Sequence, residues 1–226
     1  MCWKVGKKTK NTGLLERSAP HFYQFARDHI ACDCPKCKCP ARSAWRYSFV
    51  YIDEPAKLMY FDVPKSASTT IRKAFFDDRS SASLRNPRKG VESYLKFSFV
   101  RNPWDRMVSN WKMFTTQSAR IEQLRSMTLK DLSRFEDFVD FAVANANHHW
   151  QPQVMFLPET LDFIGKLECF DEDMNRLLSL LGKDPVDLKK RNSTRRDRYQ
   201  EYYTPRSIEA VSDYYRKDIE MFGYRF

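Results

Sequence analysis

The sequence predicts an α/β protein in which a central, mainly parallel sheet is flanked by helices, giving three layers. Short apolar runs that suit buried strands are followed by polar turns and then by segments with apolar residues at helical spacing. This order of strand, turn and helix occurs at 58–76 and again at 97–111. Chain length agrees, because 226 residues can bury one sizeable core.

The first two strands are predicted at Trp45–Ile52 and Leu58–Val63, joined by the turn Asp53–Lys57. An amphipathic helix follows the second strand. Its apolar residues share one face: Ile71, Ala74, Phe75 and Phe76.

The turn between this strand and this helix, Pro64–Thr70, has the composition of an anion-binding loop. Backbone N–H groups at a helix N-terminus attract an anion, and Lys65 adds a movable positive charge. Hydroxyl groups come from Ser66, Ser68, Thr69 and Thr70. The loop lacks the glycines and the Gly-Lys-Ser/Thr ending of a nucleoside triphosphatase loop. Taken alone, it is equally compatible with an ordinary Ser- or Thr-capped helix.

The second unit repeats this arrangement. Arg101 follows the strand Phe97–Val100, and Pro103 suits the first turn of a new helix. In that helix Arg106 and Ser109 are three residues apart and share a face. A dianionic group held by Arg101 and Ser109 is consistent with the fork of donors that arginine offers. Two such units in one chain favour a bound anion over two unrelated caps.

Further along the chain, Asp77–Gly90 is predicted as a Ser- and Arg-rich loop and Leu129–Ala146 as an amphipathic helix. Phe163–Ile164 is predicted as a short strand. Phe170–Leu181 is predicted as a helix that ends at Gly182.

Net charge and cysteine content indicate which kinds of partner and metal ion the chain could bind. The formal net charge of +10 favours an anionic partner. Four cysteines lie within eight residues: Cys32, Cys34, Cys37 and Cys39. This spacing is compatible with a structural zinc ion, with two disulfides, or with a cysteine-rich loop that forms neither.

Both anion motifs resemble those of sulfotransferases that use 3′-phosphoadenosine 5′-phosphosulfate (PAPS). Pro64–Thr70 resembles their 5′-phosphosulfate loop and Val100–Ser109 resembles their 3′-phosphate motif. The resemblance is to the carbohydrate branch, which includes the chondroitin 4-, HNK-1 and heparan 2-O-sulfotransferases. It covers roughly residues 48–226 and continues through Asn147–Gln153 and Leu161–Asp173.

This resemblance implies a P-loop-like three-layer fold in a sulfotransferase domain, 45–226, after a variable cysteine-containing extension, 1–44. It implies in-line transfer of a sulfuryl group from PAPS to a hydroxyl acceptor, which leaves PAP, and no metal is required. The residues implied to bind the nucleotide are Lys65, Ser66, Ala67, Ser68, Thr69, Thr70, Arg101, Ser109 and Arg195.

Lys65 is the expected stabiliser of the leaving phosphate oxygen. This chain lacks the histidine that the family often places between its two anion motifs. His149, which falls on a family motif, is the expected general base, because imidazole suits proton abstraction near neutrality. The alternative is a structural histidine packed beside Trp150. The fallback carboxylates are Glu92 and Glu168, although Glu168 is more readily explained as a buried partner of Lys166 or of a loop donor.

The expected acceptor is a carbohydrate or another hydroxyl compound, and the basic surface favours an anionic one. Trp104, Trp111 and Trp150 suit either stacking on sugar rings or core packing. We expect no nucleic-acid partner, and no apolar stretch is long enough to span a bilayer. The chain as given is expected to be soluble and cytoplasmic, or luminal in the Golgi if an N-terminal anchor has been removed.

Two other classes share part of this pattern. A small-molecule kinase with a P-loop would show Gly-Lys-Ser/Thr and a carboxylate for magnesium. A basic, zinc-containing nucleic-acid-binding module would use the charge and the cysteines but would leave Arg101 and Ser109 unexplained.

Overall fold

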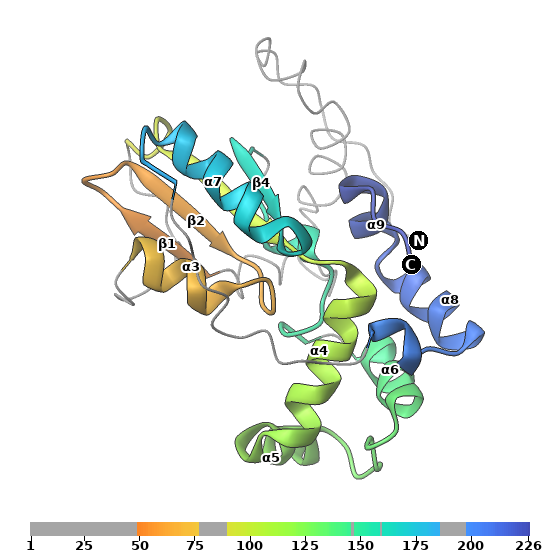
Figure 1. Ribbon diagram of the computed structural model, residues 1–226. Coiled ribbons are helices and arrows are strands. Elements are labelled where there is room, and N and C mark those ends of the chain that lie inside the picture. The colour runs from red at the N-terminus through yellow and green to blue at the C-terminus, as the bar shows by residue number, and fades with distance from the viewer. Residues whose placement is uncertain (1–48, 77–89, 146, 159, 186–197) are drawn as a thin grey trace, which may run out of the picture.

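The computed structural model describes residues 49–76, 90–145, 147–158, 160–185 and 198–226 (Figure 1). Its centre is a four-stranded sheet in the order β1-β2-β3-β4. The strands are β1 (Phe49–Asp53), β2 (Leu58–Asp62), β3 (Leu95–Val100) and β4 (Phe163–Lys166). β1 pairs with β2 antiparallel, and the other two pairings are parallel. The predicted α/β class and mainly parallel sheet are therefore confirmed.

The helices are α3 (Ser68–Phe75), α4 (Pro103–Thr116), α5 (Ser118–Met127), α6 (Phe135–Ala144), α7 (Phe170–Leu180), α8 (Pro205–Tyr214) and α9 (Arg216–Phe222). Of these, α3 and α7 cover one face of the sheet, and the other helices form a group that packs against the opposite face through α4. Short 3-10 turns lie at Gln153–Phe156, Leu167–Cys169 and Tyr199–Tyr202. None of the helices in the described ranges is long and apolar enough to cross a membrane.

Side-chain alternation along β2 explains the layers. All five of its residues are buried, so each face of the strand needs a cover. Leu58 and Tyr60 point to the face covered by α3 and α7, which Figure 1 shows in front of the sheet. Met59 and Phe61 belong to the opposite core, which α4, α6, α8 and α9 complete.

The predicted helix at Leu129–Ala146 was wrong in its start, because α6 begins only at Phe135. Side chains between the two positions bond to nearby backbone instead. Lys130 N–H donates to Thr128 Oγ1 and Ser133 N–H donates to Asp131 Oδ1. Such local bonds compete with helix formation, and Leu129 is fully exposed. The expected strand at Phe163 and the helix from Phe170 are confirmed.

The parallel pairing of β2 with β3 brings the two motifs together. Their register places Phe61 opposite Ser98, so both strands end at the same edge of the sheet. The loop Pro64–Thr70 leaves β2 at this edge, and Arg101 follows β3 there. Ligands of open α/β sheets bind at the carboxyl ends of the strands.

Candidate active site

The loop after β2 takes a backbone conformation that usually needs glycine. Lys65 has a φ of 74° and Ala67 a φ of 65°, both in the left-handed region. A side chain in that region costs roughly 1–2 kcal/mol per residue. Backbone that passes through this region at alternate residues forms a concave row of N–H groups suited to an anion. The loop therefore achieves without glycine what a nucleotide-binding loop achieves with it.

The N-terminus of α3 leaves backbone donors available. Its N-cap residue is Ala67, which makes no side-chain cap. The N–H groups of Thr70 and Ile71 donate to Ala67 O. Those of Ser68 and Thr69 make no hydrogen bond within the described ranges. These two N–H groups and the positive end of the helix dipole are donors of the kind that an anion requires.

Two loop hydroxyls turn inward. Ser66 is fully buried, and its Oγ donates to Gln153 Oε1 at 3.3 Å. Ser68 Oγ donates to the Asp62 carboxylate, with Val63 O a further acceptor at 3.2 Å. Burial raises the pKa of Asp62. In this structure both hydroxyls brace the loop, so their contact with a ligand remains a prediction.

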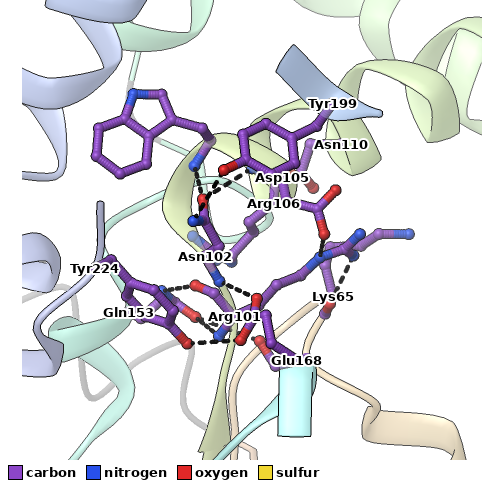
Figure 2. A network of polar contacts seen from close by, with 12 residues as sticks. Lys65, Arg101, Asn102, Asp105, Arg106, Asn110, Gln153, Glu168, Tyr199 and Tyr224 are labelled. Carbon is purple, nitrogen blue, oxygen red and sulfur yellow. Dashed lines mark hydrogen bonds and ion pairs between the residues drawn. The ribbon is translucent and has the colours of Figure 1, made fainter. Parts of the chain in front are cut away.

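Arg101 lies directly against this loop (Figure 2). Its Nη1 donates to Lys65 O at 3.1 Å, and its Nε forms an ion pair with Asp105 Oδ2 at 2.8 Å. Nη2 makes no hydrogen bond to a described residue, which leaves donors for an anion. Ser109 lies one turn beyond Asp105 on α4 and is half-buried, so it shares the side of the helix that Arg101 contacts.

Gln153 joins the two motifs and was missed as a site residue. Its Nε2 donates to Arg101 O at 2.7 Å, and its Oε1 accepts from Arg101 N–H at 2.9 Å and from Ser66 Oγ. Asp218 holds the start of the Gln153 turn, because its carboxylate accepts the N–H groups of Gln153 and Val154 at 2.8 and 3.0 Å. Burial raises the pKa of Asp218 to about 6.

Arg106 has a different place from the one its spacing to Ser109 suggested. It is fully buried, and its guanidinium donates to three backbone carbonyls. These are Pro64 O at 2.9 Å, Gln151 O at 2.9 Å and His149 O at 3.0 Å. Arg106 therefore belongs to the framework that holds the loop and the 149–151 segment together, and it is not an exposed anion ligand.

His149 and Lys65 both lie beside the second half of α4. The His149 ring packs edge-on against Phe114 with centroids 5.3 Å apart, and Lys65 Nζ lies 3.7 Å from Met113 Sδ. Burial, assisted by neighbouring positive charges, lowers the pKa of His149 to about 3. The imidazole is therefore neutral at physiological pH, and its Nε2 is buried with no hydrogen-bond partner among the described residues.

The fallback carboxylates lie in other surroundings. Glu168 is exposed rather than buried, and its carboxylate accepts the N–H of Asn102 at 2.6 Å and the hydroxyl of Tyr224 at 3.0 Å. Glu168 is thus the partner of a loop donor, which is one of the two roles expected for it. Lys166 instead donates to Phe222 O at 2.7 Å. Glu92 is exposed beside the start of β3.

Among the tryptophans, Trp104 and Trp150 are core residues, because both are buried. Trp111 is half-buried against Phe135 and Tyr202.

Several predicted residues lie outside the described ranges: Cys32, Cys34, Cys37, Cys39 and Arg195. Their roles, and the domain boundary at residue 45, remain predictions. Within the described part of the chain, no three His, Cys, Asp or Glu side chains are grouped so that they could hold a metal ion.

Comparison with known proteins agrees with this site. A family model described as "Sulfotransferase family" matches residues 48–225. The chain is 25% identical over 260 residues to carbohydrate sulfotransferase 10 of Gallus gallus, covering 96% of this chain and 72% of the relative. It is 25% identical over 233 residues to carbohydrate sulfotransferase 11 of Mus musculus, covering 76% and 66%. The chain thus spans about two thirds of the length of these relatives. No solved structure is significantly similar to it.

The strained loop gives a stability prediction. Ala67→Gly is expected to leave the free energy of unfolding unchanged or raise it by up to about 1 kcal/mol, because glycine relieves the positive φ. Ala67→Val is expected to lower it by about 2 kcal/mol. Ala74→Gly, at an exposed helical position of α3, is the control and should cost about 1 kcal/mol. Urea unfolding measures all three, and an equal loss in both glycine variants would contradict the loop conformation.

The lowered pKa of His149 gives a pH prediction. Between about pH 6.5 and about pH 3 the unfolded chain binds a proton at this residue and the folded chain does not. The contribution of His149 to the unfolding free energy should therefore fall with decreasing pH, by at most ~1.4 kcal/mol per pH unit. His149→Phe should remove this slope in urea unfolding at pH 5 to 7. Parallel curves for the two proteins would mean that the imidazole titrates normally.

Proposed function

The chain belongs to the sulfotransferase family, and on that premise we propose that it transfers a sulfuryl group from PAPS to a hydroxyl group of a carbohydrate. One observation carries the proposal. Two anion positions, the N-terminus of α3 and the guanidinium of Arg101, lie side by side, joined by the Arg101–Lys65 hydrogen bond of 3.1 Å. A nucleotide with phosphate groups at both its 5′ and 3′ ends can fill both.

The donor groups of the described residues fit such a ligand. The unpartnered N–H groups of Ser68 and Thr69, with the Lys65 ammonium, suit the 5′-phosphosulfate. Arg101 Nη2 and the Ser109 hydroxyl suit the 3′-phosphate. When bound, PAPS supplies the activated sulfuryl group, and PAP is the leaving group.

Lys65 carries the positive charge that the departing phosphate oxygen requires. Its backbone is fixed by Arg101, so little reorganisation is needed as negative charge develops on that oxygen. The side chain lies along α4 at Met113, one residue before the Phe114 ring that supports His149. Lys65, which acts on the leaving group, and His149, which acts on the acceptor, thus contact neighbouring residues of α4.

His149 is the group that takes the proton of the acceptor hydroxyl in this proposal. A base must be unprotonated before it acts, and a pKa of about 3 keeps the imidazole in that form at any physiological pH. The same shift weakens the base. Proton transfer is therefore expected to follow bond formation to sulfur, when the hydroxyl has become strongly acidic.

A carbohydrate acceptor is supported by the similarity to two carbohydrate sulfotransferases, and an anionic one by the net charge of +10. The family match spans both anion motifs. A kinase or a nucleic-acid-binding module explains neither Arg101 with Ser109 nor the loop without glycine.

The direct test is transfer of labelled sulfate from PAPS to a panel of neutral and anionic glycans. We expect label on at least one glycan, with anionic chains preferred and the preference weakened by salt. If no glycan accepted the label while a tyrosine peptide or a small phenol did, the proposed carbohydrate acceptor would be wrong. PAPS would still be the donor.

Lys65→Met tests the role given to Lys65. We expect kcat to fall about 10²–10³-fold, because a charge that acts on the leaving oxygen is lost. The dissociation constant for PAP should rise by less than about tenfold, because the N–H groups and Arg101 remain. Lys73→Met, which removes an exposed charge from α3, the helix that follows the loop, is the matched control and should keep normal turnover. A similar loss in both variants would mean that Lys65 contributes only general electrostatics.

A further inference from the structure

Two buried polar atoms beside the site have no hydrogen-bond partner among the described residues: Asn110 Oδ1 and His149 Nε2. The exposed fractions of the two residues are 0% and 8%. An unpaired buried polar group costs roughly 1–3 kcal/mol, and buried polar groups in native proteins are almost always paired. Two orphaned atoms on neighbouring side chains therefore need a common explanation.

His149 packs against the stripe of α4 to which Asn110 belongs. Arg106, Asn110 and Phe114 lie four residues apart on one stripe of α4. His149 contacts both ends of that stripe, because its carbonyl accepts from Arg106 Nη2 at 3.0 Å and its ring packs on Phe114 at 5.3 Å. Asn110 lies between these two contacts, and Figure 2 shows it beside Arg106.

The orientation of the Asn110 amide is fixed by the helix. Its Nδ2 donates to Arg106 O at 3.1 Å, so Oδ1 is the end of the amide that lacks a partner. An amide oxygen can only accept a hydrogen bond. The group that satisfies it must therefore be an N–H or O–H donor.

The two nitrogens of His149 differ in their surroundings. Nε2 is buried without a partner among the described residues, whereas Nδ1 is not among the buried unpaired atoms and makes no hydrogen bond to a described residue. A neutral imidazole carries one hydrogen, so one nitrogen donates and the other accepts. An acceptor hydroxyl can approach only the nitrogen that is not sealed, so the hydrogen belongs on Nε2.

The charged groups around His149 do not supply an acceptor for that hydrogen. They are the cations Lys65, Arg106 and Arg120, and the ring of His148 lies tilted against that of His149 with centroids 3.7 Å apart. The three cations are donors only. Apart from His149 Nε2 itself, Asn110 Oδ1 is the one acceptor among the buried unpaired side-chain atoms of the described residues.

We propose that Asn110 is a positioning residue for His149: its Oδ1 accepts the hydrogen of Nε2 through one bridging water, and so keeps Nδ1 as the proton acceptor. This inference rests on the function proposed above. As the acceptor oxygen bonds to sulfur, its proton passes to Nδ1. The bond between sulfur and the bridging phosphate oxygen breaks, and that oxygen keeps the electron pair beside Lys65. A partner that fixes the tautomer of a catalytic histidine is a recurring device in enzymes.

Nitrogen-15 NMR of the histidine-labelled full chain, with His149 assigned by its absence from His149→Phe, tests the tautomer directly. We expect the neutral form with hydrogen on Nε2 in the wild-type protein and a mixture of both tautomers in Asn110→Leu. Hydrogen on Nδ1 in the wild-type protein would overturn the proposal. This result does not depend on turnover, so it stands apart from any failure of sulfate transfer.

Kinetics supply the second test. Asn110→Leu is expected to lower kcat about 10–100-fold with the KM for PAPS unchanged, the usual size of an effect on a supporting residue. Asn110→Asp should place a carboxylate by the ring, raise the pKa of His149 and move the acid limb of the kcat/KM profile to higher pH. Thr115→Ala removes a similar bond, from Oγ1 to Trp111 O at 2.8 Å, and is the matched control. Wild-type turnover and pH profile in both Asn110 variants would overturn the proposal.

Discussion

The buried guanidinium of Arg106 is the contact on which the rest of the site depends. It joins the carbonyl that precedes Lys65 to the carbonyls of His149 and Gln151, three groups from two distant segments, at 2.9 to 3.0 Å. A hydrogen bond to a charged group contributes roughly 1.5–3 kcal/mol, and each carbonyl left unpaired in the core would cost a similar amount. This side chain therefore joins the donor loop directly to the segment that carries the candidate base.

A second brace holds the strained loop in place. Gln153 ties Ser66 to the backbone of Arg101, and Asp218 holds the turn from which Gln153 projects. These bonds compensate for the positive φ angles of Lys65 and Ala67, which the loop could not keep alone. The N–H groups at the start of α3 are therefore preorganised for a ligand, because the bonds that hold the loop in place use other atoms.

The sequence was informative where local pattern decides the structure. Apolar runs and turn residues located β2, β3 and α7, and the residues after β2 and β3 identified both anion motifs. The sequence was uninformative where a side chain bonds to a residue that is distant along the chain. Ser66 and Ser68 look like ligand donors in sequence, but they bond to Gln153, 87 residues away, and to Asp62. Arg106 looks equivalent to Arg101 in the sequence, but in the fold it is buried and donates to three backbone carbonyls.

The central claim is that one ligand with phosphate groups at both ends joins the α3 N-terminus to Arg101. Thermal unfolding with saturating PAP, with ATP and with buffer alone tests it most directly. PAP at about 100 times its dissociation constant should stabilise the fold by roughly 2.7 kcal/mol and raise the midpoint by a few degrees. ATP has no 3′-phosphate for Arg101 and should give a much smaller shift. Equal shifts with both nucleotides, or none with PAP, would contradict the account.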